Sequence, residues 1–287
     1  LFTAVVFWAI LKWEAVADEP GSYRWIVFIA FLMGLSIGVH LLNLLAIPAI
    51  TLLFYFKKFK VTKPGIFLAF GISILILAAI MYGIIPQLVT LFAKTELFFV
   101  NGLGLPFNSG TLFFGLLIVA LVLTGLIYTE KNIKIIPILF IVFYAVLLFL
   151  VLYSGTSVWS FVFRFIIISA VTALIYIARQ KKELLKTVLL SFVFIVIGYS
   201  SFMVLVIRSN ADTPLNENAP KDAISLLSYL NREQYGDWPL WYGPYFNAPY
   251  DSKEPYIAGK PLYARDDAAK KYVVVDERKY SEPNYDK

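Results

Sequence analysis

The sequence predicts an all-α polytopic bundle of about eight membrane segments, followed by the start of a soluble extracytoplasmic α/β domain. Composition gives the first reason, because 60% of the residues are hydrophobic, 15% are charged and the mean hydropathy is +0.75. Soluble domains carry about 25% charged residues. Apolar runs also recur up to residue 207, and basic residues gather in alternate linkers between them. These observations divide the chain into a transmembrane domain, 1–207, and a soluble segment, 208–287.

The first apolar stretch, Leu1–Leu11, has only about half of the roughly 20 residues that span a bilayer. It does not begin with Met, and it lacks the basic start and the cleavage site of a signal peptide. We interpret it as the end of a helix, and the chain as an internal fragment of a longer protein. Later runs of near-spanning length are Ile66–Ile85, Thr111–Tyr128, Ile135–Tyr153, Val158–Ala178 and Thr187–Ile207.

The run from Trp25 to Phe56 is too long for one crossing. As a straight helix its roughly 32 residues would extend about 48 Å, whereas the hydrocarbon core is about 30 Å thick. The linkers on both sides of it are basic, with Lys12 and Arg24 before the run and "KKFKVTK" after it. Positive residues favour the cytoplasmic face, so we predict two short arms with a turn at Val39–Asn43.

The same rule orders the remaining linkers. "TEKNIK" and "ARQKKELLK" are basic and fall on the cytoplasmic side, whereas 86–110, "SGTS" and the tail 209–287 fall on the outer side. The outer linker 86–110 begins with an amphipathic stretch, Leu88–Phe98. This pattern is typical of a short helix lying on the outer leaflet, here followed by a glycine-rich loop.

The tail after residue 207 changes character and contains no apolar run of spanning length. "AISLLSYLNREQYG" predicts an amphipathic helix that stops at Gly236. "DWPLWYG" and "KKYVVVDERKY" predict strands. Together these segments predict the opening of an α/β domain.

Several classes of function are disfavoured by composition. The chain has no Cys and one His, so a thiolate or histidine-rich metal site is not expected and we predict no metal site. Residues 1–207 hold 14 of the 25 basic residues and six of the 19 acidic residues. Membrane topology explains this excess, so no nucleic-acid partner is expected. No acidic residue lies in a predicted span, which argues against proton-coupled transport.

His40 and Asn43 lie at the predicted turn, and two interpretations of the pair stay open. In the first, both side chains are partly solvated and form their hydrogen bonds locally at the turn. In the second, they contact a phosphate or sugar at the outer mouth of a cavity. Ionisable residues at membrane depth are costly and are functional candidates by default.

Three cations raise a similar question. Arg164 lies near the outer end of a predicted span, where its side chain either reaches the interface or binds a phosphate inside the bundle. Lys94, on the predicted interfacial helix, has the same two interpretations. Arg208 ends the last span on the outer side, where it pairs either with a lipid phosphate or with Asp212 or Glu217.

Two stretches carry a resemblance to a known family. They are "MGLSIGVHLLNLLAIPAI", followed by "YFKK", and "NENAPKDAISLLSYLNREQYGDWPLWYGPYFNAP". Both resemble a bacterial, Bacteroidota-type family of protein O-mannosyltransferase-like multi-pass proteins, which includes a domain formerly of unknown function. The family belongs to the GT-C glycosyltransferase superfamily, and the two stretches bracket most of the chain.

The resemblance implies an enzyme of the bacterial inner membrane. It would transfer a sugar, with mannose expected, from a polyprenyl-phosphate donor to a protein or other acceptor on the periplasmic side. The general base would be an Asp or Glu in an outer loop upstream of this chain, since the topology places Asp18 and Glu19 in the cytoplasm. The alternative is a non-catalytic transporter of lipid-linked intermediates, or a scaffold subunit of an envelope complex.

The resemblance also implies partners and site residues. The partners are the lipid bilayer, the lipid-linked donor as a substrate, a polypeptide acceptor and other subunits of a membrane complex. By position, the candidates on the phosphate side are His40, Asn43, Arg164 and Arg208. The candidates in the tail, which would either shape the outer mouth or tie the tail to the bundle, are Asn216, Glu217, Asn218, Tyr229, Asn231 and Arg232.

Overall fold

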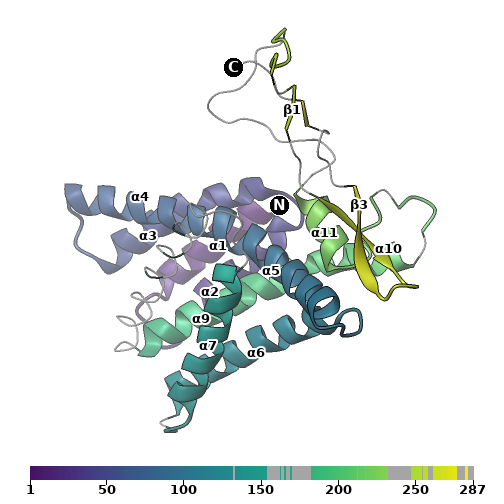
Figure 1. The fold of residues 1–287 in the computed structure, drawn as a ribbon. Coiled ribbons are helices and arrows are strands. Elements are labelled where there is room, and N and C mark those ends of the chain that lie inside the picture. Colours follow the sequence, from purple (N-terminus) through teal and green to yellow (C-terminus); the bar gives the residue numbers. More distant parts are fainter. Residues whose placement is uncertain are drawn as a thin grey trace. The chain divides into compact units, whose positions relative to one another are not determined.

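The computed structural model of the protein is mostly helical, with two small antiparallel strand pairs (Figure 1). Contacts divide the chain into unit 1, Leu1–Leu88 with Leu116–Val204, and unit 2, Val89–Gly115 with Leu205–Lys287. The structure describes all residues except 132, 154–161, 163, 164, 166–168, 170–181, 212, 217, 232–246, 254, 258–260, 277–281 and 284–287.

Unit 1 confirms the predicted break in the long apolar run. Helix α2 (Tyr23–Ile37) ends just before the predicted turn, and the chain resumes as a 3-10 helix, η1 (Leu41–Ala46), that leads into α3 (Ile47–Lys58). Pro48 lies in the first turn of α3, where its missing N–H is tolerated. The preceding helix, α1 (Phe2–Ala15), packs on α3 through the stacked rings of Trp13 and Phe54, whose centroids lie 5.0 Å apart.

A lysine shows that α2 and α3 run in opposite directions. Lys58, at the end of α3, donates a hydrogen bond of 2.6 Å to the Ala17 carbonyl oxygen and forms an ion pair of 2.8 Å with Asp18. Ala17 and Asp18 precede α2, so the start of α2 and the end of α3 lie at the same end of unit 1. The hydrogen bond and charge of Lys58 lower the pKa of Asp18, which keeps the Asp18 carboxylate ionised at neutral pH. The two basic linkers therefore meet, as the hairpin prediction requires.

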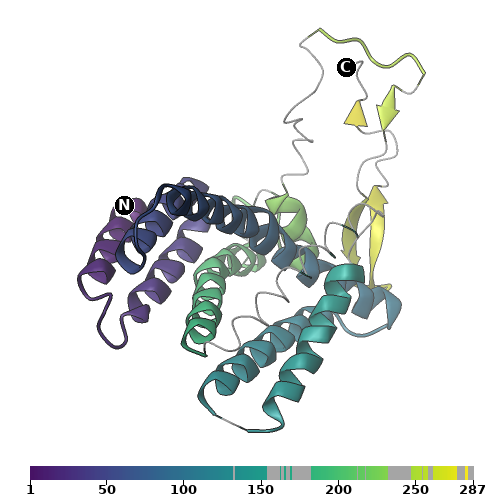
Figure 2. The same ribbon diagram turned by 90° about the vertical axis from the view of Figure 1, so that its left-hand side faces the viewer.

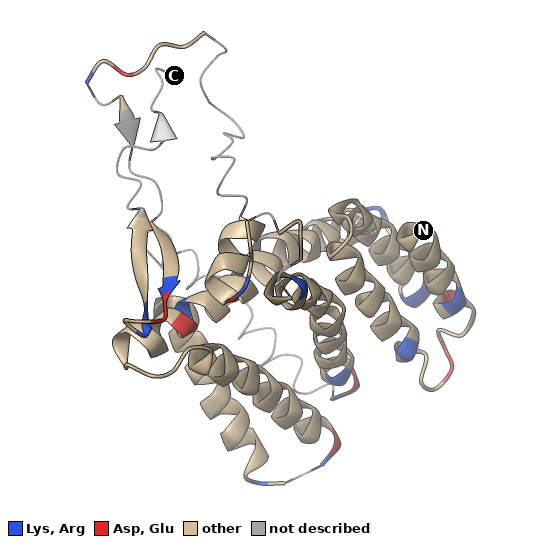
Figure 3. Cartoon of the chain, turned by 90° about the vertical axis from the view of Figure 1, so that its right-hand side faces the viewer, with Lys and Arg blue, Asp and Glu red and all other residues tan. Residues whose placement is uncertain are grey.

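The basic ends of two further helices lie at the same end of unit 1 as the start of α2 and the end of α3. Lys186 of α9 (Lys182–Tyr199) forms an ion pair of 2.7 Å with Glu130, the last residue of α6 (Ser109–Glu130). The Lys186 ammonium also lies 5.8 Å from the ring centroid of Tyr23, the first residue of α2. Figure 3 shows charges of unit 1 at helix ends and in loops. The cationic end is defined here by Lys12, Arg24, Lys57, Lys58, Lys60, Lys63, Lys131, Lys134, Lys182 and Lys186.

Helices α2 and α9 pack with their backbones in close approach. A Cβ atom added at Gly198 of α9 would lie 2.5 Å from both the Leu35 nitrogen and the Phe31 carbonyl oxygen. One added at Gly34 would run into the backbone of Ile195, and one added at Gly38 would lie 2.7 Å from the Ser201 hydroxyl. Small residues spaced four apart are a recurrent means of packing membrane helices. The Gly34–Gly38 pair serves this purpose here.

The path from residue 63 to residue 102 differs from the prediction. The sequence predicts a span ending at Ile85 and then a separate helix. Instead α4 (Lys63–Ala78) continues through a π-helical turn, η2 (Ala79–Ile84), into α5 (Ile85–Leu97) and a second π-helical turn, η3 (Phe98–Gly102). The wide turn lies just before Pro86, in the first turn of α5, so the helical path continues despite the missing proline N–H.

Among the described residues, four helical stretches are long and apolar enough to cross a membrane by length and composition. They are Leu41–Lys58, Lys63–Gly102, Ser109–Glu130 and Lys182–Asn210. Two shorter apolar helices are Tyr23–Ile37 and the start of α7 (Ile136–Tyr153), up to Leu152. Over the described residues the structure thus supports about four spans and leaves the predicted eight unconfirmed, since most of the predicted span Val158–Ala178 lies outside those residues.

Unit 2 combines helical segments with strands. Beyond η4 (Ser200–Phe202), the chain enters α10 (Met203–Asn210) and later α11 (Ala223–Leu230). Figures 1 and 2 show the antiparallel pairs β2 (Leu262–Asp266) with β3 (Lys271–Asp276), and β1 (Tyr256–Ile257) with β4 (Glu282–Pro283).

The structure tests two of the three elements predicted in the tail. The strand predicted in "KKYVVVDERKY" is confirmed over β3. Helix α11 begins where predicted, with Asp222 and Ser225 forming a capping box, but it ends at Leu230 rather than at Gly236. Asn231 already closes the last turn through its N–H. The strand predicted in "DWPLWYG" lies outside the described residues.

Candidate functional site

A buried carboxyl group organises the first half of unit 2. Glu96, near the end of α5, is 0% exposed. One of its oxygens accepts a hydrogen bond of 2.5 Å from the Asn108 N–H, and the other accepts from the N–H (2.9 Å) and hydroxyl (3.1 Å) of Thr111. The first N–H groups of a helix have no partner within it, and a negative charge there is favourable. Glu96 therefore caps α6 from a neighbouring helix.

The two helices meet closely at this cap. A Cβ atom added at Gly110 would lie 2.5 Å from the Glu96 Cα atom and would also collide with the Thr95 carbonyl oxygen. The Phe92 and Phe114 rings pack edge to face beside them, with centroids 4.7 Å apart. The start of α6 is thus fixed against α5 by both hydrogen bonds and packing.

The β2–β3 hairpin attaches to the end of this segment. The Asn101 amide donates a hydrogen bond of 2.8 Å to the Tyr272 carbonyl oxygen and accepts one of 2.9 Å from the Tyr272 N–H. The Phe107 ring lies edge to face on Tyr272, and the Arg265 guanidinium lies 4.1 Å from the Phe107 centroid while pairing with Asp267. Most of the segment 86–110, from Val89 onward, therefore forms one folded unit with the described residues of 209–287.

The Tyr272 hydroxyl is the unusual group in this cluster. The residue is 3% exposed, and its hydroxyl has no hydrogen-bond partner among the described residues. Burial raises the pKa of Tyr272 first, and the nearby negative charges of Asp222 and Glu96 raise it further. The phenol therefore stays neutral near neutral pH.

The turn after α2 separates the roles of His40 and Asn43. The exposed His40 caps η1, since its Nδ1 accepts a hydrogen bond of 3.1 Å from the Leu42 N–H. This geometry assigns the ring proton to Nε2 in the neutral imidazole. Asn43 is 4% exposed, and its amide nitrogen donates to the Ser36 hydroxyl (3.0 Å) and the Met33 sulfur (3.3 Å). Asn43 thus fits the interpretation in which the side chain is hydrogen-bonded locally at the turn. The exposed His40, in contrast, can donate a hydrogen bond from Nε2 to a group outside the turn.

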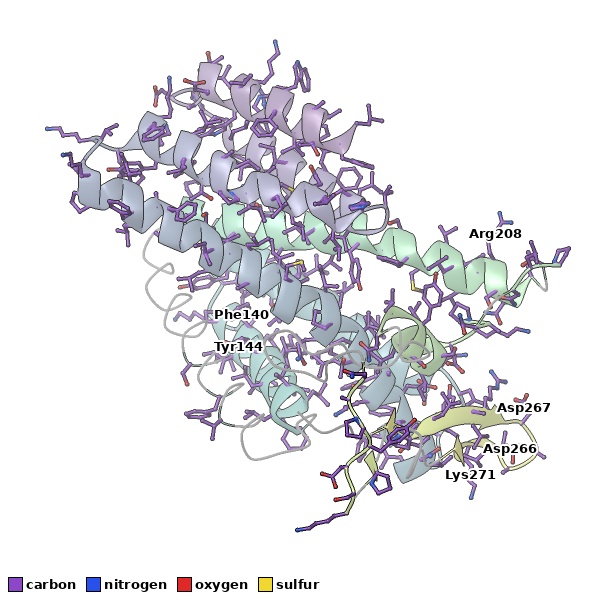
Figure 4. All side chains as sticks on the ribbon, turned by 90° about the horizontal axis from the view of Figure 1, so that it is seen from above. Phe140, Tyr144, Arg208, Asp266, Asp267 and Lys271 are labelled. Atoms are coloured by element: carbon purple, nitrogen blue, oxygen red, sulfur yellow. The ribbon has the colours of Figure 1, made fainter. Side chains whose placement is uncertain are left out.

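Arg208 is more accessible than Lys94. It lies exposed on α10 and forms no ion pair with any residue that the structure describes. Its two predicted protein partners, Asp212 and Glu217, lie outside the described residues. Figure 4 shows the Arg208 side chain directed away from the turn that carries Asp266 and Asp267.

The remaining candidates divide into placed and unplaced residues. Lys94 lies partly buried on α5. Asn216 is tied to α10, because its side chain accepts a hydrogen bond of 2.9 Å from the Ser209 hydroxyl and donates one of 2.9 Å to the Ser209 carbonyl oxygen. Asn218 is exposed in a turn with a φ of 58°. Arg164 and Arg232, like Glu217, lie outside the described residues.

The structure places His40 and Asn43 at the same turn of unit 1, and Asn216 beside Ser209, the residue that follows Arg208, in unit 2. Sequence analysis missed the structural roles of Gly34, Gly198 and Glu96. Two signals were present, since Gly34 and Gly38 are spaced four apart and Glu96 is the only acidic residue between Glu19 and Glu130. The Asn101–Tyr272 pairing had no comparable signal.

Comparisons with known proteins bear on both ends of the chain. The apolar helices indicate a membrane protein by length and composition. Residues 1–63 match the family model described as Protein O-mannosyl-transferase TMEM260 N-terminal domain. Residues 236–287 match a Family of unknown function (DUF8416). Comparisons with curated proteins and with solved structures each found no significant match.

The first match supports the O-mannosyltransferase-like resemblance over the stretch that carried it. "MGLSIGVHLLNLLAIPAI" and "YFKK" both fall within residues 1–63. The second stretch overlaps the other family from residue 236 onward. Together with the apolar helices, the first match fits a membrane glycosyltransferase.

Proposed function

We propose that this chain is part of an integral membrane glycosyltransferase. It transfers a sugar, mannose, from a polyprenyl-phosphate donor to a protein acceptor on the periplasmic side of the bacterial inner membrane. The match of residues 1–63 to an O-mannosyl-transferase domain carries the proposal. The assignment to the GT-C superfamily rests on the resemblance in the same stretch.

The arrangement of unit 1 supports the proposed orientation. The cationic end holds the start of α2 and the end of α3, and positive residues favour the cytoplasmic face. Helix α2 leads away from that end, so His40 follows its opposite end. A donor in the outer leaflet would then present its phosphate at the depth of His40.

Hydrogen-bond donors that the predicted topology places on this side would do two things for the reaction. They would bind the donor phosphate, and they would stabilise the charge that grows on it as the sugar leaves. We assign this role to the His40 Nε2–H and to Arg208, with Lys94, Arg164 and Arg232 as further candidates.

Other candidates would position these groups. Asn43 holds η1 on α2 through both of its N–H groups, and Asn216 holds the tail on α10. The base that takes the proton of the acceptor hydroxyl would be an acidic residue supplied from a segment preceding this chain.

One observation favours the alternative, a non-catalytic transporter or scaffold. The carboxyl groups of Glu96, Asp222 and Asp267 in unit 2 are all engaged in caps or ion pairs. None of the three is placed as a base. Binding of the lipid-linked donor without any transfer by the full-length protein would identify the alternative.

The test uses full-length protein, polyprenyl-phosphate mannose and a peptide acceptor. The substitution His40→Asn keeps a residue that caps helices but removes the imidazole N–H, and Arg208→Gln removes the guanidinium. We expect each substitution to raise the KM for the donor by about tenfold, because each removes one charge-assisted hydrogen bond to the phosphate.

Lys60→Gln removes a cation from the opposite, cationic end and serves as the control. Its KM should stay at the wild-type value. If His40→Asn and Arg208→Gln both leave donor binding and transfer unchanged, the assignment of the phosphate site is wrong.

A further inference from the structure

A groove of about 240 Å³ opens between α2 and α9 near the cationic end. A cavity of about 150 Å³ can hold a benzene molecule, so this groove is large enough for part of one alkyl chain. Its lining is almost wholly apolar, with Arg24 as the one charged residue. The apolar and aromatic lining consists of Tyr23, Val27, Phe28, Phe31, Leu190 and Phe194.

The walls of the groove are set by aromatic packing. The Phe31 and Phe194 rings pack edge to face across the α2–α9 contact, with centroids 6.3 Å apart and planes at 86°. Phe28 and Phe194 remain 36% and 37% exposed, so the groove is open along its side. The close approach of the two backbones at Gly34 and Gly198 fixes the crossing from which these side chains project. Such a surface within an apolar span faces lipid tails rather than water.

The mouth of the groove is positively charged. Arg24 is exposed and forms no ion pair with a described residue, and it lies in the first turn of α2, where the helix dipole favours an anion. The Lys186 ammonium closes the same end over the Tyr23 ring, although Glu130 neutralises part of its charge. The cationic end holds ten basic residues, and the described linkers and helix ends around it hold five acidic ones, Glu14, Asp18, Glu19, Glu130 and Glu183.

We propose that this groove binds an anionic phospholipid. One acyl chain lies along the aromatic and aliphatic walls, and the headgroup phosphate accepts hydrogen bonds from the Arg24 guanidinium. The charge of the mouth selects the headgroup, because a net positive surface attracts acidic lipids, and the planar guanidinium matches a phosphate oxygen pair. This site differs from the proposed donor site, which lies at the other end of α2.

Native mass spectrometry of the purified protein with phosphatidylglycerol or phosphatidylcholine of identical acyl chains tests the proposal. We expect phosphatidylglycerol to bind about fivefold more tightly than phosphatidylcholine, because one basic residue near an anionic headgroup contributes about 1 kcal/mol. Arg24→Gln should remove that preference. Leu190→Trp, which fills the groove, should weaken binding of both lipids.

Two matched variants serve as controls. Val188→Trp adds the same bulk to an exposed position of α9 outside the groove, and Lys60→Gln removes a cation of the same end that does not line it. Both should bind like the wild type. Equal affinity for the two lipids overturns the headgroup assignment. Equal losses with Leu190→Trp and Val188→Trp overturn the groove, and an unchanged preference in Arg24→Gln overturns the role of Arg24.

Discussion

Replacing Gly198 with leucine is expected to separate α2 from α9 and to lower the free energy of unfolding by about 3 kcal/mol. A Cβ atom at this position would lie 2.5 Å from backbone atoms of Phe31 and Leu35, and backbone atoms cannot rotate away as a side chain can. Because packing rather than water drives helix association in lipid, this contact carries much of the interaction between the two helices. Unfolding of the purified protein in mixed micelles by increasing SDS would measure the change.

Gly71→Leu is the matched control for this prediction. Gly71 lies in the apolar helix α4, and a Cβ atom there would meet nothing within 4 Å. The control should unfold within about 0.5 kcal/mol of the wild type. A loss in Gly198→Leu no larger than the loss in Gly71→Leu would show that α2 and α9 do not pack through Gly198.

Replacing Glu96 with alanine is the second substitution with a large expected effect. It removes the acceptor for two backbone N–H groups and one hydroxyl, and leaves these donors at a buried site. We expect a loss of about 3 kcal/mol, since hydrogen bonds to a charged group contribute about 1.5–3 kcal/mol. Hydrogen exchange should report it locally, as faster exchange of the Asn108 and Thr111 amides.

Asp267→Ala provides the comparison, because it removes an exposed ion pair with Arg265 in the same unit. Exposed pairs contribute about 0–1 kcal/mol, so unfolding should change little. If the Asn108 and Thr111 amides exchange at wild-type rates in Glu96→Ala, then Glu96 does not cap α6.

The parts of the fold that the sequence predicted are those governed by length and charge. The break after Ile37 followed from a run too long for one crossing between two basic linkers. The contact of Lys58 with Ala17 and Asp18 agrees with that inference. Both constraints act along the chain, so they can be found without knowing which helices touch.

Features that depend on a distant partner were not predictable. Asn101 and Tyr272 are separated by 171 residues, and nothing in either neighbourhood indicates the other. The continuity of α4 with α5 depends on a π-helical turn before Pro86, where the sequence suggested a helix end.

The candidate site shows the same division. The sequence singled out His40 and Asn43 by their polarity, but the capping contact of His40 and the burial of Asn43 required the structure. Only the structure distinguishes His40, whose Nε2–H can bind a ligand, from Asn43, which holds the turn in place.

Single-cysteine labelling tests most directly the central claim, that His40 and unit 2 face the compartment opposite to the cationic end. These 287 residues hold no Cys, so each introduced cysteine is the only one among them. Glu19→Cys and Lys60→Cys report the two linkers beside Asp18 and Lys58, and Val39→Cys and Asp267→Cys report the turn and unit 2. We expect an impermeant maleimide added outside spheroplasts to label positions 39 and 267 and to reach 19 and 60 only after permeabilisation. Labelling of positions 19 and 60 from opposite sides would contradict the two crossings, and labelling of 60 together with 267 would contradict the orientation.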